Sequence, residues 1–197
     1  MKKKAEERKN QILRAAFQAM SVQGYNSVTL QSIADYAEVS KGVVHYYFEN
    51  KEDTLSQLLE WLTDKIYNYE LASVNSESTP LGKLKAYVNS VFVAPEKNAK
   101  FYRVYLDFLS QAGQNETYRK INHRFYQNCW NITSDIITSG QKTGVFEQNI
   151  NVEKTSKTMR AIIDGLLIQW LMNEDINSHQ YYKETCYQSF LDLLKVN

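Results

Sequence analysis

The chain has 197 residues, which is enough to bury the core of one large domain or of two small ones. Its 23 basic and 22 acidic residues leave a formal net charge of +1, so the total charge alone gives little support for a nucleic-acid partner. The two cysteines, Cys129 and Cys186, are too few for a disulfide scaffold, and no charged and then apolar leader opens the chain. No apolar run approaches the roughly 20 residues of a membrane helix, so we expect a cytoplasmic protein with no membrane partner.

The first predicted helix covers residues 5–22. Its apolar residues recur every three or four positions, and Gly24 stands just past its end. Basic residues crowd this helix and the arm before it, namely Lys2, Lys3, Lys4, Arg8, Lys9 and Arg14. Taken alone, the run indicates either a solvated tail or a phosphate-binding surface. A neighbouring DNA-binding element would favour the second interpretation.

Two short helices joined by a tight turn are predicted between residues 29 and 51. Thr29 can cap the first of them, and Ser40 can cap the second. The inward residues of the first helix recur at helical spacing: Leu30, Ile33, Ala34 and Ala37. The second helix is too short to be stable alone and is apolar on one side, so it must dock on its neighbours. Its outward residues are Lys41, Gly42, His45 and Tyr46. This pattern is typical of a helix-turn-helix that binds DNA.

From Thr29 to Leu55 the chain resembles the TetR family of bacterial transcriptional repressors, whose pattern runs T-x-x-x-I-A-x-x-A-x-V-S-x-G-x-x-Y-x-Y-F-x-x-K-x-x-L. Two positions depart from the family. Glu38 stands in the turn where the family often has Gly, and a left-handed conformation costs a non-Gly residue about 1–2 kcal/mol. His45 stands where the family commonly has Tyr, so its contacts with bases or phosphates would differ and could respond to pH.

The fourth predicted helix opens at Asn50 and runs to about residue 74, with Glu52 and Asp53 in its first turn, where acids suit the helix dipole. Lys51 is a cation at the positive end of the same helix, where it opposes the dipole. We therefore expect it to contact a phosphate, whose negative charge would complement both the lysine and the helix end. The predicted DNA-binding residues are Thr29, Ser40, Lys41, Gly42, His45, Tyr46, Tyr47 and Lys51.

The rest of the chain continues the helical pattern after a polar break at residues 75–80. Five more helices are expected, at residues 81–92, 97–111, 116–143, 152–173 and 178–195. We therefore predict an all-α protein of about nine helices. Residues 1–50 form the helix-turn-helix domain and residues 51–197 form a helical domain for effector binding and dimerisation, with helix four linking the two.

The last two helices carry an apolar band that is wider than one core-facing stripe. The predicted dimer residues are Ile162, Ile163, Leu166, Trp170, Phe190 and Leu194. The alternative is that they all serve the core of one chain. A homodimer is favoured because one short recognition helix covers few base pairs and helix-turn-helix proteins usually bind palindromes as dimers. In such a dimer the last two helices could form half of an intermolecular four-helix bundle, as the family resemblance also implies.

Aromatic residues at helical spacing in the middle of the chain suggest a pocket for a small-molecule effector. The candidates for binding this ligand are Phe101, Tyr105, Phe108, Phe125, Cys129 and Trp130. For any one of them, plain core packing is the simpler role, so they are candidates only as a group.

Catalytic and metal sites have no support in the sequence. The three histidines are isolated, and the glycines at 140 and 144 lack the Lys-Ser/Thr ending of a phosphate loop. Cys129 and His123 would lie on different faces of a helix. We expect neither a metal nor a cofactor, and not an enzyme. The favoured function is a ligand-responsive repressor of a double-stranded DNA operator; the alternative is a helical interaction or architectural module that binds nucleic acid without an effector.

Overall fold

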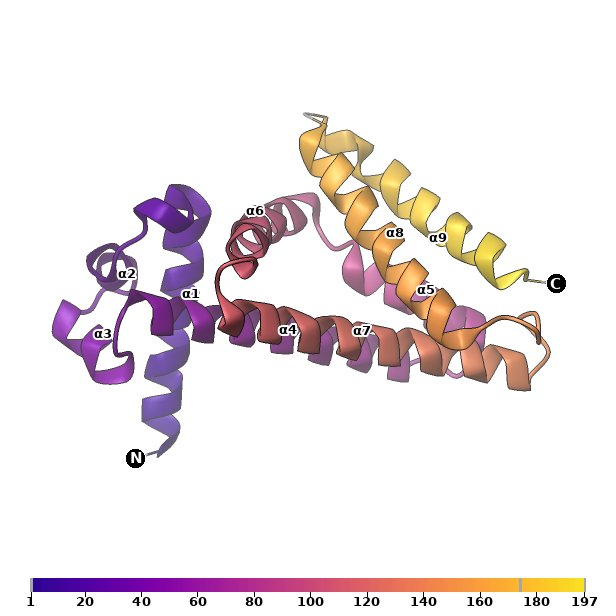
Figure 1. Ribbon diagram of the computed structural model, residues 1–197, viewed down its shortest axis with the longest axis horizontal. Helices are drawn as coiled ribbons and strands as arrows, with labels where there is room; N and C mark the ends of the chain where they lie inside the picture. Colours follow the sequence, from indigo (N-terminus) through magenta and orange to yellow (C-terminus); the bar gives the residue numbers. More distant parts are fainter. Residues whose placement is uncertain (1, 174, 197) are drawn as a thin grey trace. The chain divides into compact units, whose positions relative to one another are not determined.

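The computed structural model describes residues 2–173 and 175–196. Throughout these residues all regular structure is helical, which confirms the predicted fold class (Figure 1). A short 3₁₀ turn at Ile176–Ser178 separates the last two α-helices. The α-helices are α1 (Lys2–Ser27), α2 (Leu30–Tyr36), α3 (Lys41–Tyr47), α4 (Lys51–Asn75), α5 (Pro80–Val91), α6 (Pro95–Ala112), α7 (Glu116–Lys142), α8 (Val152–Met172) and α9 (His179–Leu194).

Several helices begin at the residues that the sequence predicts. The amide oxygen Oδ1 of Asn50 accepts a hydrogen bond from the Asp53 N–H at 2.9 Å and opens α4. The hydroxyl of Thr79 accepts from the Gly82 N–H at 3.1 Å and opens α5. Pro95 is the first residue of α6, two residues before the predicted start at residue 97. A proline fits there because the first N–H of a helix has no intrahelical partner.

Gly24 interrupts α1 near its C-terminal end. Its φ of 76° and ψ of 168° lie outside the helical region, although helical hydrogen bonding resumes as far as Ser27. Gly has no Cβ to clash in this region, so the chain can turn there at little steric cost. The break falls where the sequence predicts the end of the first helix.

The two helices of the helix-turn-helix differ in how they begin. At α2, the Thr29 hydroxyl accepts from the Ser32 N–H at 3.0 Å, while the Ser32 hydroxyl accepts from the Thr29 N–H at 2.9 Å. This reciprocal pair confirms Thr29 as the cap. Ser40 occupies the capping position of α3 but its side chain makes no capping hydrogen bond, so that part of the prediction is wrong. The Ser40 carbonyl instead accepts from the N–H groups of Val43 and Val44.

The chain packs as two compact units. The first contains Met1–Asp64 and Arg103–Asn122, and the second contains Lys65–Tyr102 and His123–Asn197. Three helices, α4, α6 and α7, pass from one unit into the other within their own length. The division by packing therefore follows neither a loop nor the residue 50 boundary drawn from the sequence.

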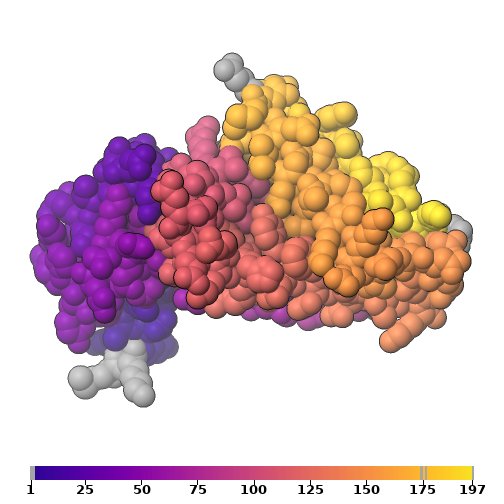
Figure 2. Space-filling model, viewed as in Figure 1, coloured from indigo at the N-terminus to yellow at the C-terminus, as the bar shows by residue number. Residues whose placement is uncertain are grey.

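Within the second unit, α8 packs along α9, and the two form adjoining orange and yellow surfaces in Figure 2. Both helices also contribute to the core through fully buried side chains such as Ile163, Leu167 and Phe190. Among the helices of the described residues, none combines the length and the apolar character needed to cross a bilayer.

Candidate DNA-binding surface and effector-binding core

The outward side of α3 carries the predicted recognition surface, which consists of Lys41, Gly42, His45 and Tyr46. All four residues are exposed, and 81% of the Tyr46 surface is open to solvent. Val44 and Phe48 lie on the opposite side and are buried, which docks α3 on the rest of the first unit. Tyr47 is half-buried and its ring packs edge-on against Tyr46, with 5.0 Å between the centroids.

α1 supports the helix-turn-helix and adds exposed positive charge. Arg8 donates to the side chain of Gln11 at 2.9 Å, and the Gln11 amide donates to the Ala37 carbonyl at 2.7 Å. This chain of hydrogen bonds ties α1 to the end of α2. The side chains of Lys3, Lys4, Arg8 and Arg14 are exposed, so they are accessible to phosphates.

Lys51, for which the sequence predicts a phosphate contact, makes hydrogen bonds within the chain, and the phosphate contact stays a prediction. Its Nζ donates to the Tyr25 carbonyl at 2.8 Å and to the Asn26 carbonyl at 3.1 Å. The ammonium also lies 5.3 Å from the centroid of the Tyr25 ring. Partial burial lowers its pKa. Two of its three donors thus join α4 to the end of α1, where carbonyls without helical partners attract a cation.

Tyr25 connects the end of α1 to the α6–α7 segment of the same unit. Its backbone N–H donates to Asp107 Oδ2 at 3.0 Å, and its hydroxyl lies 3.1 Å from that of Tyr118. Its ring packs edge-on against Phe108 and Tyr118, at 6.2 and 6.0 Å between centroids. Residues 103–122 are therefore part of the packing of the DNA-binding head.

The six predicted pocket residues do not come together in one unit. Tyr105 and Phe108 are buried in the first unit, and Phe108 belongs to the aromatic cluster around Tyr25. Phe101, Phe125, Cys129 and Trp130 belong to the second unit. For Phe108 the simpler alternative, core packing, describes what the structure shows.

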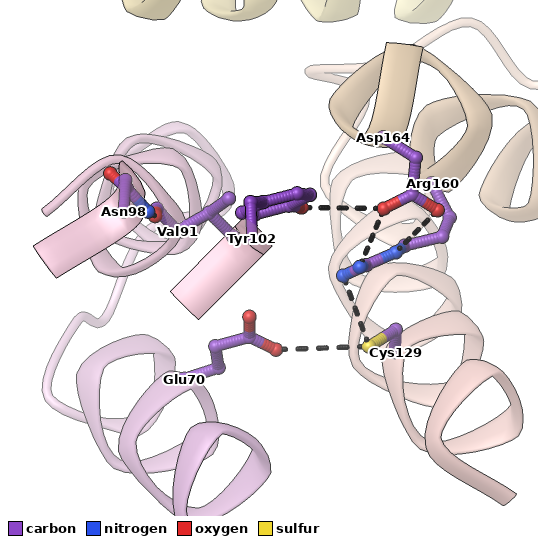
Figure 3. A network of polar contacts seen from close by, with 7 residues as sticks. All are labelled: Glu70, Val91, Asn98, Tyr102, Cys129, Arg160 and Asp164. Carbon is purple, nitrogen blue, oxygen red and sulfur yellow. Dashed lines mark hydrogen bonds and ion pairs between the residues drawn. The ribbon is translucent and has the colours of Figure 1, made fainter. Parts of the chain in front are cut away.

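A buried polar cluster occupies the interior of the second unit (Figure 3). Arg160 is 3% exposed and donates from Nη2 to Asp164 Oδ1 at 2.7 Å and from Nε to Asp164 Oδ2 at 3.2 Å. Its Nη1 lies 3.5 Å from the sulfur of Cys129. The Tyr102 hydroxyl donates to Asp164 at 3.4 Å. The guanidinium carbon also lies 4.8 Å from the centroid of the Phe125 ring.

Glu70 brings a second carboxyl group into this cluster from α4. It is 1% exposed, and the thiol of Cys129 lies 3.9 Å from its Oε2. Burial raises the pKa of Glu70 to about 7, although the charge of Arg160 acts in the opposite direction. Burial likewise raises the pKa of Cys129 to about 12, so this cysteine is a neutral thiol. The Tyr87 hydroxyl, on α5, is buried and has no hydrogen-bond partner among the described atoms.

Glu70, Tyr87 and Arg160 were not predicted as site residues, yet the sequence contains a signal for two of them. Glu70 follows Leu62 and Ile66 at four-residue steps on the inward stripe of α4. Arg160 holds the equivalent place on α8 between buried Ser156 and Ile163. A charged residue in an apolar register is rarely buried without a partner, and that irregularity marks both positions.

The predicted dimer residues divide into two groups. Ile163, Trp170, Phe190 and Leu194 are buried within the single chain and belong to its core, so they cannot offer a surface to a partner. Ile162 and Leu166 are half-buried and line a shallow groove of about 410 Å³. The other residues along this groove are Thr158, Ala161, Gly165, Gln169 and Ser189.

Two family models match separate parts of the chain. The family model described as "Bacterial regulatory proteins, tetR family" matches residues 12–58, and the one described as "BetI-type transcriptional repressor, C-terminal" matches residues 80–192. The chain is 26% identical over 164 residues to the fatty acid metabolism regulator protein of Bacillus subtilis, covering 83% of this chain and 84% of that protein. It is 24% identical to the transcriptional regulator TtgR of Pseudomonas putida, covering 88% and 85%.

Solved structures show the same fold. A TetR transcription regulator from Haloarcula marismortui is 25% identical and superposes with a TM-score of 0.83, covering 96% of this chain and 97% of that one. A transcriptional regulator from Saccharomonospora viridis, solved in complex with choline, is 23% identical and has a TM-score of 0.85, covering 95% and 96%.

Proposed function

Because the chain belongs to the tetR family of bacterial regulatory proteins, we propose that it is a repressor that binds a palindromic DNA operator as a homodimer and leaves it when a small organic effector binds. Such a protein acts in the cytoplasm, where it meets double-stranded DNA. The observation that carries the proposal is the recognition surface of α3. Four exposed residues stand on a helix whose other side is docked, as a helix placed in the major groove requires.

The homodimer follows from the size of that surface. A helix of seven residues contacts few base pairs, so useful specificity needs a second copy on a second half-site. The groove beside Ile162 and Leu166 supports α8 as the contact between copies. Gly165 lies in this groove and would let a partner helix approach closely.

The effector response follows from the helices that join the two units. A ligand that moves α4, α6 or α7 within the second unit acts on helices whose other ends belong to the head. A dimer whose half-sites are about 34 Å apart loses contacts when its heads leave that spacing. The choline complex of the Saccharomonospora regulator supports a small organic ligand as the effector class.

Selection of bound fragments from random DNA, followed by footprinting, tests the proposal. We expect a palindrome whose half-sites are one helical turn apart, or a multiple of it. Tyr46→Ala should weaken binding by about 1–3 kcal/mol and change the preferred base at one position of each half-site. Tyr181→Ala is the matched control, because Tyr181 is similarly exposed but lies on α9. Recovery of no preferred sequence would reject the repressor in favour of a module that binds nucleic acid without specificity.

A further inference from the structure

The charges in the interior of the second unit do not balance. Arg160 and Asp164 neutralise each other through two hydrogen bonds, at 2.7 and 3.2 Å. The remaining guanidinium nitrogen, Nη1, is directed to the sulfur of Cys129 at 3.5 Å. Within the described part of the chain, Glu70 is left without a cation of its own, although it is almost fully buried. A buried carboxylate without a partner is costly.

Two polar groups of this interior, Glu70 and Tyr87, also lack good hydrogen bonds. The contact that the structure gives Glu70 is a long one, 3.9 Å from the Cys129 sulfur. The Tyr87 hydroxyl has no partner among the described atoms, and burial, followed by the charge of Glu70, raises the pKa of Tyr87. Closed protein cores normally pair such groups. A ligand between α4 and α5 would give the Glu70 carboxyl and the Tyr87 hydroxyl the partners that they lack.

The surroundings suit a positive ligand rather than a negative one. The guanidinium of Arg160 already lies over the rings of Phe125 and Tyr126, at 4.8 and 5.7 Å from their centroids. Aromatic faces stabilise cations in this way. An anion would meet two carboxyl groups, and all three guanidinium nitrogens of Arg160 are already engaged.

We infer that this cluster binds an organic cation, with the Glu70 carboxylate as counter-ion and the Tyr87 hydroxyl as a second contact. The inference rests on the proposed function, because it names the chemical class of the effector. It also gives the ligand a route to the DNA-binding head. Glu70 lies on α4, whose first half belongs to the first unit, so a ligand beside Glu70 would act on a helix that both units share.

Calorimetry on the full-length protein tests the inference with three probes, benzyltrimethylammonium, tetraethylammonium and choline. The control is 3,3-dimethylbutan-1-ol, the uncharged isostere of choline. We expect one or more of the cations to bind. Because the free carboxyl has a pKa of about 7 and the bound one must be ionised, affinity should rise about tenfold between about pH 6 and pH 8. At about pH 6, binding should release about 0.9 proton, measured in buffers of different ionisation enthalpy.

The variant Glu70→Gln separates the counter-ion role from general packing. It keeps the shape of the side chain and removes its charge, so affinity for the cations should fall at least about tenfold and lose its pH dependence. Glu77→Gln, which changes an exposed acid of the same unit, should bind as the wild type does. Thermal unfolding of each variant establishes that it is folded.

Three results would overturn the inference: no cation binds, Glu70→Gln binds the cations with wild-type affinity, or the uncharged isostere binds as tightly as choline. The wild-type binding and proton-release measurements do not depend on any variant. DNA selection on the wild type is independent of them too. If the protein selects a palindrome but binds no cation, the proposed function stands and the cationic effector class is rejected. If it binds cations but selects no DNA sequence, the cation site stands and the proposed function is rejected.

Discussion

Glu38 holds an uncommon backbone conformation in the turn between α2 and α3. Its φ is 54°, in the left-handed region that glycine adopts without strain. The sequence predicted this conformation, because the residue occupies a position where related helix-turn-helix turns often have glycine. The side chain is exposed, so the strain is not offset by burial.

Replacing Glu38 with glycine should therefore stabilise the protein. Removal of the left-handed strain, about 1–2 kcal/mol, outweighs the greater freedom of glycine in the unfolded chain, about 0.5–1 kcal/mol. We expect a net gain of about 0.5–1 kcal/mol in the free energy of unfolding, measured in urea. Glu38→Ala retains a Cβ and should show no such gain. If alanine stabilises as much as glycine, the side chain rather than the backbone is responsible.

Glu70 should make stability depend on pH. Its folded-state pKa is raised from 4.5 to about 7, so between these values the folded chain holds a proton that the unfolded chain has lost. Stability should thus fall as pH rises from about 4.5 to about 7, by an amount on the order of 3 kcal/mol, and the penalty should persist above pH 7. Glu70→Gln should lack this component. Urea unfolding of both proteins at several pH values measures it, and parallel curves would contradict the assignment.

At the scale of single helices, the sequence predicted where most elements begin and end, because caps and turn residues act locally. Thr29 and Asn50 are examples. Which element covers a buried helix face depends on the tertiary structure and not on the nearby sequence. The periodicity of α8 correctly marks Ile163 and Trp170 as buried, but it cannot tell whether the covering helix belongs to the same chain or to a partner. Both residues are covered by their own chain.

Of the predicted dimer residues, Ile162 and Leu166 line the groove on α8, so the dimer prediction is tested there. Leu166→Glu places a charge on the open face of the helix, so it should yield folded monomers that bind DNA weakly. Sedimentation equilibrium measures the oligomeric state and circular dichroism the helix content. Met172→Glu, at an exposed position near the end of α8, should leave the dimer intact. A dimer that survives Leu166→Glu would place the interface on another surface.

The junction between α1 and α4 depends on Lys51. Lys51→Met keeps most of the side-chain volume and removes both hydrogen bonds to the α1 carbonyls. We expect the free energy of unfolding to drop by about 1–2 kcal/mol, since the donor is charged but only partly buried. Lys97→Met, at an exposed site on α6, should have little effect. Unchanged stability, together with a salt dependence of DNA binding that is lower by about one unit, would restore the phosphate contact.

At the scale of the whole molecule, the predicted pocket shows that regular spacing along one helix does not determine which packing unit each residue joins. Phe101, Tyr105 and Phe108 recur regularly on α6, yet the first lies in one packing unit and the other two in the other. The helix continues through the boundary without a break, so no loop or change in composition marks it. The acid at Glu70, which was not predicted as a site residue, is the stronger signal for the interior of the second unit, because a charged residue interrupts the apolar register of α4.

Coupling between effector and DNA must be reciprocal if the proposed switch is correct. An effector that weakens operator binding by some factor must itself bind the DNA-bound protein more weakly by the same factor, typically about 5–150-fold. Calorimetric titration of one bound cation into free and operator-bound protein measures the factor directly, and salt and pH must match. Equal affinities for the two forms would mean that the ligand does not control DNA binding.

The part that residues 103–122 play in the head has a consequence for how this protein can evolve. Tyr25 is held by Asp107 and Tyr118, which are encoded far from α1. A recombination event that joins a foreign head to this chain along α4 would separate Tyr25 from both partners. We therefore expect an exchange of heads along α4 to cost these contacts of Tyr25, whereas point substitutions on the outer side of α3 leave them in place.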